Sequence, residues 1–451
     1  MKPMICTGGA TALALVLLFC MTAPAVANEA DQKKAPETTT AFADIQDSVP
    51  NIPPVLTLEW CLKRARAANP ALAEATALAL AAEHRIRPAG ALDDPRLAYD
   101  ASNIPTGDFD FDSTPLSGHQ LGLRQKLPFP GLLSSRRTAA RRGYESSDLL
   151  VEDRRLLTEG AVESAWAELA FAQQALDITD RNIDLLRQLA ATAESRYRVG
   201  SGIQQDVLRA HVELTALLQE RLRREESIER TSSRLVELLD LPAETDLPRT
   251  ADLNSTETVP PLPTLLASLG QKNARLRSAE KRVEEARLRI RVAELEGLPD
   301  VDLGIGYRVR KSVPGDPVDG DNFLSAGFTV RLPLNRAKWR SKVAEQESLL
   351  RRAQAQLRGI RAQLGSQTRS AHAELVRASS EEALLETGLV PQARQSLAAS
   401  RSAYKVGRVD FPSLLDSQVR LLGAELQLVR ARADKRRAFA ALETASGETL
   451  R

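Results

Sequence analysis

The chain has 451 residues, of which 43% are hydrophobic but only 4% aromatic, and 27% carry a charge. This composition is typical of long helices and coiled coils, and it disfavours a globular core rich in aromatic side chains. The 61 basic and 59 acidic residues nearly cancel, which argues against a nucleic-acid-binding protein.

Residues 1–27 have the pattern of a secretory signal peptide. A lysine precedes an apolar run at 11–20, and residues 25–27 are Ala-Val-Ala, an A-x-A cleavage site. We therefore expect export and cleavage after Ala27. An N-terminal membrane anchor is the first alternative, but the apolar run is short for a span. Lipidation at Cys20 is the second, and it is disfavoured because the large Phe19 precedes the cysteine.

Residues 28–54 are polar and rich in proline, which predicts an extended segment. A helix is expected at about 56–89. Two short runs follow at 95–103 and 119–127, in which apolar residues alternate with polar ones. Such alternation is typical of strands, and we expect these two to form a β-hairpin over 95–128.

A very long helix is predicted next, from about 134 to 199. Its apolar residues recur at every seventh position, the spacing of a coiled-coil seam, at Leu169, Leu176, Ile183, Ala190 and Tyr197. Gly200 ends the helix, because glycine adopts the left-handed conformation at a helix C-terminus without steric cost. A tip turn at 200–205, a second helix at 205–239 and a connector at 240–263 follow.

The second half of the chain repeats this order, which predicts a tandem duplication with repeats at 55–239 and 264–445 and a tail at 446–451. The motif Tyr197, Val199, Gly200 reappears as Tyr404, Val406, Gly407. The predicted parts of the second repeat are a helix, a β-hairpin at 299–333, a long helix with apolar residues seven apart from Val343 to Leu385 and a kink at Pro391, a tip turn at 407–412, and a last helix.

The four predicted strands place apolar residues on one face and polar residues or glycine on the other. An antiparallel sheet packed on a core by one face explains this pattern, and so does a membrane barrel with a wet lumen. Export, strand lengths suited to a membrane crossing, and charges on the polar face such as Arg124, Asp302, Arg308 and Arg331 favour the barrel. Four strands cannot close a barrel, so several copies of the chain are required.

The hairpin loops at 104–118 and 311–322 are rich in aspartate. Asp-x-Asp runs could bind Ca²⁺, but the twelve-residue calcium-loop spacing with a terminal glutamate is absent. We therefore expect solvated outer loops. The aspartates are Asp108, Asp110, Asp112, Asp316, Asp319 and Asp321.

The mature chain offers few side chains for metal or nucleophilic chemistry. Cys61 is its single cysteine, and all three methionines fall in the signal segment. The histidines His84, His119, His211 and His372 are scattered. The sequence contains no GxSxG, P-loop, HExxH or CxxC pattern, so we predict no enzyme, no cofactor and no metal site.

Three motifs together resemble the TolC-like outer-membrane efflux family. They are the duplicated Tyr-x-Val-Gly turn, the Leu-Pro that follows the second strand of each hairpin, and the Leu-x-x-Ala-x-x-x-Asn-Pro segment from Leu62 to Pro70. The resemblance covers essentially the whole mature chain. The block Leu-Pro-Phe-Pro-Gly at 127–131 is similar to that of members paired with heavy-metal efflux pumps.

The resemblance implies an α+β membrane protein that forms a homotrimer in the outer-membrane lipid, with a large periplasmic portion. Three copies of four strands would make a twelve-stranded β-barrel, continued by a long α-helical barrel. The implied function is a passive exit duct of a tripartite efflux pump, with a periplasmic adaptor protein and an inner-membrane pump of the RND type as partners. The cargo stays open between metal cations and drugs.

The resemblance also implies roles for residues at the tip turns. The adaptor would meet Val199, Gly200, Ser201, Gly202, Val406, Gly407 and Arg408. Two acidic positions narrow the closed entrance in the family; they fall here on Ser413 and Asp416, of which only Asp416 is acidic. Asp206 and Asp410 could contribute, or could be carboxylates stabilised at a helix N-terminus. Tyr404 and Tyr197 could anchor the closed state, although packing in the seam is favoured.

Two other functions stay open. One is the outer-membrane component of a type I protein secretion system, which would also be a duct. The other is a periplasmic coiled-coil scaffold without a pore. Four amphipathic strands in matched hairpins argue against the scaffold, which has no use for them.

Overall fold

The computed structural model describes residues 51–107, 114–253 and 258–450. The predicted signal peptide and Cys20 lie outside these ranges, as do Asp108, Asp110 and Asp112. The elements described below all belong to the unit that begins at Asn51.

The helix predicted at 56–89 is three helices, so that prediction is wrong in its continuity. They are α2 (Leu58–Ala68), α3 (Pro70–His84) and α4 (Ile86–Ala89). The break lies at Asn69, whose ψ of 122° is extended, because the residue before a proline avoids the helical region. The Asn69 side chain accepts a hydrogen bond from the Ala71 amide at 3.0 Å and so caps α3.

The second repeat has the same break. Its first helical segment is α7 (Leu262–Lys272) followed by α8 (Ala274–Glu296). Asn273 separates them, and its side chain accepts a hydrogen bond from the Leu276 amide at 3.0 Å. Each asparagine also donates to a carbonyl at the far end of its own repeat, Asn69 to Leu238 at 2.8 Å and Asn273 to Ala445 at 3.1 Å. The two asparagines therefore tie the beginning of each repeat to its end.

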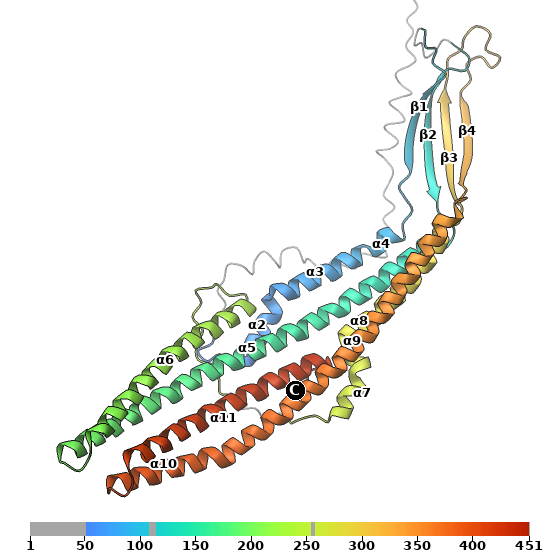
Figure 1. Cartoon of the computed structure of the whole chain (residues 1–451). Helices are drawn as coiled ribbons and strands as arrows, with labels where there is room; N and C mark the ends of the chain where they lie inside the picture. Colours follow the sequence, from blue (N-terminus) through green and yellow to red (C-terminus); the bar gives the residue numbers. More distant parts are fainter. Residues whose placement is uncertain (1–50, 108–113, 254–257, 451) are drawn as a thin grey trace, which may run out of the picture. The chain divides into compact units, whose positions relative to one another are not determined.

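The four strands form one antiparallel sheet in the order β1-β2-β3-β4. They are β1 (Arg96–Ser102), β2 (Gly118–Leu127), β3 (Asp300–Val309) and β4 (Phe323–Arg331). A helix precedes β1 and β3, and a helix follows β2 and β4, so the sheet lies beyond the helix ends (Figure 1). Leu97 faces Leu123, which in turn faces Ile305, so the register gathers apolar side chains on one face as the alternation predicted.

The outer loop of the second hairpin is not simply solvated. The side chains of Arg310 and Asp316 are buried and form an ion pair at 3.0 Å. Asp316 also accepts a hydrogen bond from the Gly320 amide at 2.8 Å, and the Arg310 guanidinium lies 4.3 Å from the centre of the Phe323 ring. For Asp316 the prediction of a solvated aspartate is therefore wrong, because this carboxylate holds the loop together.

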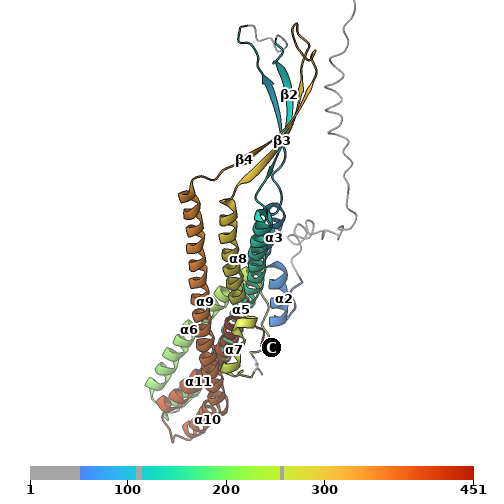
Figure 2. The same ribbon diagram turned by 90° about the vertical axis from the view of Figure 1, so that its right-hand side faces the viewer.

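The longest helix, α5 (Leu132–Arg198), has 67 residues and spans roughly 100 Å. It packs against α3 and α8 as well as against α6 (Gln204–Leu238) and α11 (Phe411–Ser446). Figure 2 shows these helices running side by side below the sheet. Arg221 of α6, which interrupts the predicted seam, instead donates a hydrogen bond to Asp180 of α5 at 2.9 Å.

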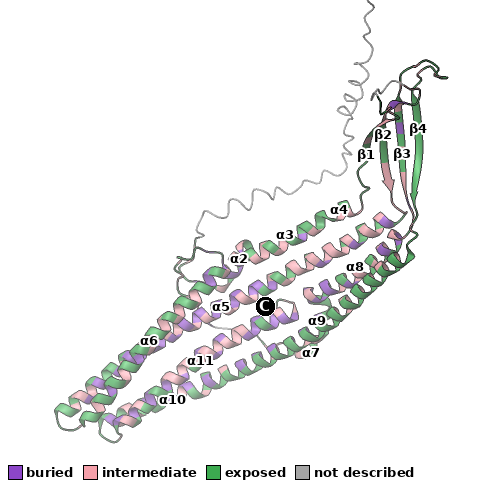
Figure 3. Cartoon of the chain, turned by 45° about the horizontal axis from the view of Figure 1, so that its top comes forward, coloured by how far each residue is buried: buried purple, intermediate pink, exposed green. Residues whose placement is uncertain are grey.

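The second long helix is divided where the sequence predicts a kink. It consists of α9 (Arg336–Leu384), a π-helical turn at Leu385–Leu389, and α10 (Val390–Lys405). Pro391 is the second residue of α10, and its lack of an N–H removes one hydrogen bond from the regular ladder. The first half of α9 is mostly exposed in the single chain, whereas α5 and α11 carry many buried residues (Figure 3).

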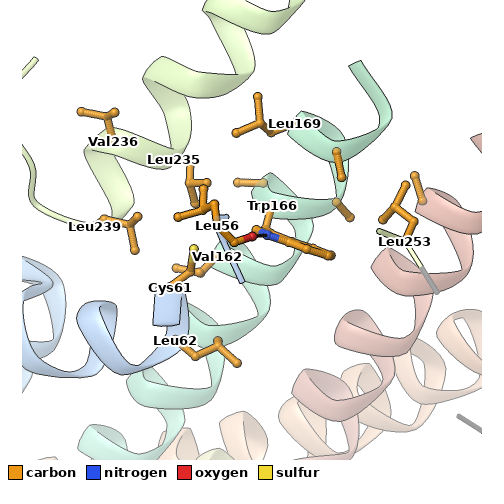
Figure 4. Packing of buried hydrophobic residues seen from close by; sticks show 14 of the residues in the cluster. Leu56, Cys61, Leu62, Val162, Trp166, Leu169, Leu235, Val236, Leu239 and Leu253 are labelled. Atoms are coloured by element: carbon orange, nitrogen blue, oxygen red, sulfur yellow. Dashed lines mark hydrogen bonds between the residues drawn. The ribbon is translucent and has the colours of Figure 1, made fainter. Parts of the chain in front are cut away.

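The largest core cluster lies where α2, α5, α6 and α11 meet. Figure 4 shows Trp166 of α5 at its centre, beside Leu56, Cys61 and Leu235. The Trp166 Nε1 donates a hydrogen bond to the Leu56 carbonyl at 2.9 Å. Burial raises the pKa of the Cys61 thiol to about 12, so this cysteine is an inert core residue.

Candidate functional site at the two helical tips

Both tip turns have the same backbone geometry. Gly200 and Gly407 have φ of 76° and 73°, a left-handed conformation that favours glycine. The Ser201 amide donates to the Arg196 carbonyl at 2.9 Å, and the Arg408 amide donates to the Ala403 carbonyl at 2.9 Å. Each is the six-to-one bond of a Schellman motif, so the predicted role of the two glycines in ending the helices is confirmed.

The turns are shorter than predicted. The first spans Val199 to Ile203, because α6 already begins at Gln204, and the second spans Val406 to Asp410. Val199 and Val406 are 76% and 69% exposed, and Ile203 is 59% exposed. Each tip therefore presents apolar side chains that nothing in the single chain covers.

Arg196 joins the two tips. Its Nη2 donates a hydrogen bond to the Ser201 carbonyl of its own tip at 3.2 Å, and its Nη1 donates to the Tyr404 carbonyl of the other tip. The guanidinium carbon also lies 4.7 Å from the centre of the Tyr404 ring. One side chain thus clamps residues that are about 200 positions apart in the sequence.

Tyr404 is packed between helices, as favoured from the sequence, and it also contacts Arg196. Its side chain is 4% exposed, and its ring meets Phe411 edge-on with 5.7 Å between ring centres. Burial raises the pKa of Tyr404, and the negative charge of Asp206 adds to the rise. Tyr197, its counterpart in the first repeat, is 47% exposed, so in the single chain its predicted packing in the seam is wrong.

Asp410 and Asp206 stand at the N-termini of the two returning helices. The Asp410 side chain caps α11 by accepting a hydrogen bond from the Ser413 amide at 3.2 Å, and its hydrogen bonds with Ser413 lower the pKa of Asp410. Burial raises the pKa of Asp206; the positive charge of Arg209 opposes this rise and the negative charge of Asp410 adds to it. Asp410 is therefore a carboxylate that stabilises a helix N-terminus, which was one of the two roles considered for it.

A small hollow lies between the tips and contains most of the predicted site residues. It is lined by Arg196, Ser201, Gly202, Asp206, Tyr404, Gly407, Arg408, Val409, Asp410 and Phe411. Ser413 and Asp416 lie outside it. Asp416 is on the exposed side of α11, where its carboxylate pairs with the Arg420 guanidinium at 2.7 Å and its side chain is 60% exposed.

Arg196 is the residue that sequence reasoning missed. The signal was present, because the two tip motifs, SRYRVG and SAYKVG, place Arg196 in the position that Ala403 holds in the second repeat. A long cation that appears in one copy only is a candidate for a contact between the copies. The contact between Arg196 and Tyr404 could not be predicted from the spacing of residues in the sequence.

Two further features of the described residues bear on the site. The described ranges hold no group of three or more His, Cys, Asp or Glu side chains arranged to bind a metal ion. Across the same ranges, no helix is both long enough and apolar enough to cross a bilayer.

Known proteins share this sequence pattern and this fold. The profile of the family described as outer membrane efflux protein matches residues 61–240 and 265–448, one segment for each repeat. The pyoverdine export outer membrane protein OpmQ of Pseudomonas putida is 23% identical over 355 residues, which are 77% of this chain and 73% of OpmQ.

Solved structures agree with the family match at the level of the fold. The outer-membrane channel OprN has a TM-score of 0.75 at 18% identity, over 87% of this chain and 90% of OprN. The outer membrane protein VceC of Vibrio cholerae has a TM-score of 0.72 at 19% identity, over 87% of this chain and 97% of VceC.

These matches confirm the predicted family, fold class and outer-membrane location. Proteins of this family are transport channels rather than enzymes, and they are trimers that work with adaptor and inner-membrane pump proteins. Because the two matched segments make up most of the sequence, the chain belongs to the outer membrane efflux protein family.

Proposed function

We propose that three copies of this chain assemble into the exit duct of a tripartite efflux pump, with the two tips of each copy at its periplasmic entrance. The sheet carries this proposal. Within the described residues, β1 and β4 each have a strand on one side only. A backbone edge cannot be left unpaired in hydrocarbon, so β4 of one copy would pair with β1 of the next.

The lipid-facing side of the sheet supports the same assembly. Leu97, Leu324 and Phe328 are 76%, 78% and 73% exposed in the single chain. An exposed apolar face of this kind is a liability in water and the expected surface in a bilayer. The opposite face, with its charges and glycines, would line the lumen.

The trimer and the duct can be tested in one preparation. The protein extracted with detergent from the outer-membrane fraction should migrate as a trimer that heating dissociates, and it should conduct ions in a planar bilayer. Recovery of the chain as a soluble monomer would contradict the proposal.

At the entrance, the contacts of Arg196 that join the two tips would keep the duct closed. The exposed Val199, Ile203 and Val406 would bind the adaptor. Apolar side chains at two adjacent turns offer a helical-hairpin partner a surface to cover. The pump would be of the RND type and would deliver the cargo to the duct. Co-purification of the adaptor and pump with the tagged chain, followed by mass spectrometry, would identify both partners.

Asp416 would act as a cation-attracting ring where three copies of α11 meet. Replacing Asp416 by alanine is expected to lower the cation-over-anion permeability ratio roughly two- to threefold, because three carboxylates leave the entrance. Arg420→Ala should act in the opposite direction, since it removes the cation that pairs with Asp416 at 2.7 Å. Reversal potentials in a salt gradient measure both changes.

A matched control is available on α6. Glu226 pairs with Arg230 in the same i,i+4 arrangement at 3.5 Å, in the middle of the helix rather than at its tip. Glu226→Ala should leave the permeability ratio unchanged. If Asp416→Ala also left it unchanged, Asp416 would have no place in the gate.

A further inference from the structure

The polar face of the sheet contains one layer whose charged residues all have the same sign. Arg96 of β1 lies directly opposite Arg124 of β2, and the same row continues through Gly304 of β3 to Gly327 of β4. Like charges in facing positions of an antiparallel pair are destabilising. Their presence in adjacent strands therefore calls for a reason other than the stability of the sheet.

The neighbouring layers are built differently. Towards the helices, Asp300 is held by Arg331 at 2.7 Å and by Lys126 at 3.3 Å. Towards the outer loops, the Arg308 guanidinium donates hydrogen bonds to Gln120 at 3.3 Å and to Ser102 at 3.0 Å. In both layers the cations have partners within the chain.

Arg96 and Arg124 have no such partner among the described residues. Five aspartates line the same hollow, but none of their carboxylates lies within the 4.0 Å of an ion pair with either arginine; they are Asp93, Asp94, Asp100, Asp300 and Asp302. Glycine occupies the rest of the layer. A side-chain carbon built on Gly304 would lie 3.6 Å from Cγ of Arg124, and one built on Gly327 would meet no neighbouring atom. On the polar face of the sheet, the glycine positions of this layer therefore leave free space beside the arginines.

We propose that Arg96 and Arg124 form an anion-binding belt in the lumen, and that the duct favours cargo carrying carboxylate or phosphate groups. The inference rests on the proposed function, because only the assembly of three copies turns two arginines per copy into a closed belt. Guanidinium groups recognise such anions through paired hydrogen bonds as well as charge. The glycines leave room for a ligand next to the arginines, since they place no side chain in the layer.

Inorganic triphosphate is a suitable probe, with binding to the detergent-purified trimer measured by titration calorimetry at low salt. The variant Arg96→Gln/Arg124→Gln should bind about tenfold more weakly or not at all, whereas Arg96→Lys/Arg124→Lys should retain part of the affinity. The matched control is Lys126→Gln/Arg308→Gln, which removes the same number of lumenal cations. It should weaken binding by less than about threefold, because its cations already have partners.

Conductance of the same samples separates the two proposals. Triphosphate added on the side of the outer loops should block the wild-type current and block the arginine variant only at about tenfold higher concentration. Unchanged binding in the arginine variant, or an equal loss in the lysine–arginine control, would overturn the belt while leaving the duct intact. A trimer that binds triphosphate through the belt but carries no current would overturn the duct and support the belt.

Discussion

Replacing Arg196 by alanine is expected to raise the open probability of the reconstituted trimer about tenfold. A hydrogen bond from a charged group contributes about 1.5–3 kcal/mol, and a partly exposed cation–π contact about 0.5–1 kcal/mol. Arg196 makes contacts of both kinds with Tyr404, but the guanidinium is half-buried, so we discount the sum to about 1.5–2 kcal/mol per copy. A change of this size shifts a two-state equilibrium by a factor of ten or more.

Neighbouring residues supply the controls. Arg198 is exposed, and the structure gives it no hydrogen bond or ion pair within the described ranges, so Arg198→Ala removes the same charge without breaking the clamp. It should leave the open probability unchanged. Arg196→Lys should have an intermediate effect, because an ammonium cannot reach the Ser201 and Tyr404 carbonyls with the fork of a guanidinium. Equal effects of Arg196→Ala and Arg198→Ala would show that charge, not the contact between the tips, controls opening.

The elements of this fold with a strong local pattern could be predicted from the sequence. Alternation placed all four strands, and the Val-Gly pairs placed both tips, because glycine at a left-handed helix end is a local requirement. The duplication could be read for the same reason, since both copies keep those local signals. The break at Asn69 also has a local signal, the Asn-Pro pair, but the helical pattern on either side of it predicts one continuous helix.

The candidate site was predicted less completely, because its chemistry depends on contacts between the repeats. The hollow between the tips depends on Arg196 reaching Tyr404, and no helical or strand period connects those two positions. Asp416 shows the reverse case. Its partner Arg420 lies four residues further on the same helix, a pairing that spacing alone makes available. A ring of Asp416 carboxylates must therefore act in the presence of Arg420, which would reduce its field at the entrance.

The largest expected loss of stability is that of Trp166→Ala, at about 3–5 kcal/mol. Trp166 is 5% exposed at the centre of the cluster that joins α2, α5, α6 and α11, so its removal leaves a cavity that four helices would have to close. The indole also holds the Leu56 carbonyl, and the Leu56 amide donates to the Arg249 carbonyl at 2.7 Å. The substitution thus loosens the contact between the start of the first repeat and the connector.

Two variants separate the contributions. Trp166→Phe keeps most of the volume but loses the hydrogen bond; it should cost about 1 kcal/mol, because the Leu56 carbonyl still accepts from the Ala251 amide at 3.1 Å. Trp60→Ala removes the same side chain from the partly buried edge of the same cluster, and about half the effect of Trp166→Ala is expected. Because large assemblies often unfold irreversibly, the half-life of helical circular dichroism at a fixed elevated temperature is the appropriate measure. A half-life for Trp166→Ala no shorter than that for Trp60→Ala would mean that the four-helix junction is not what holds the chain together.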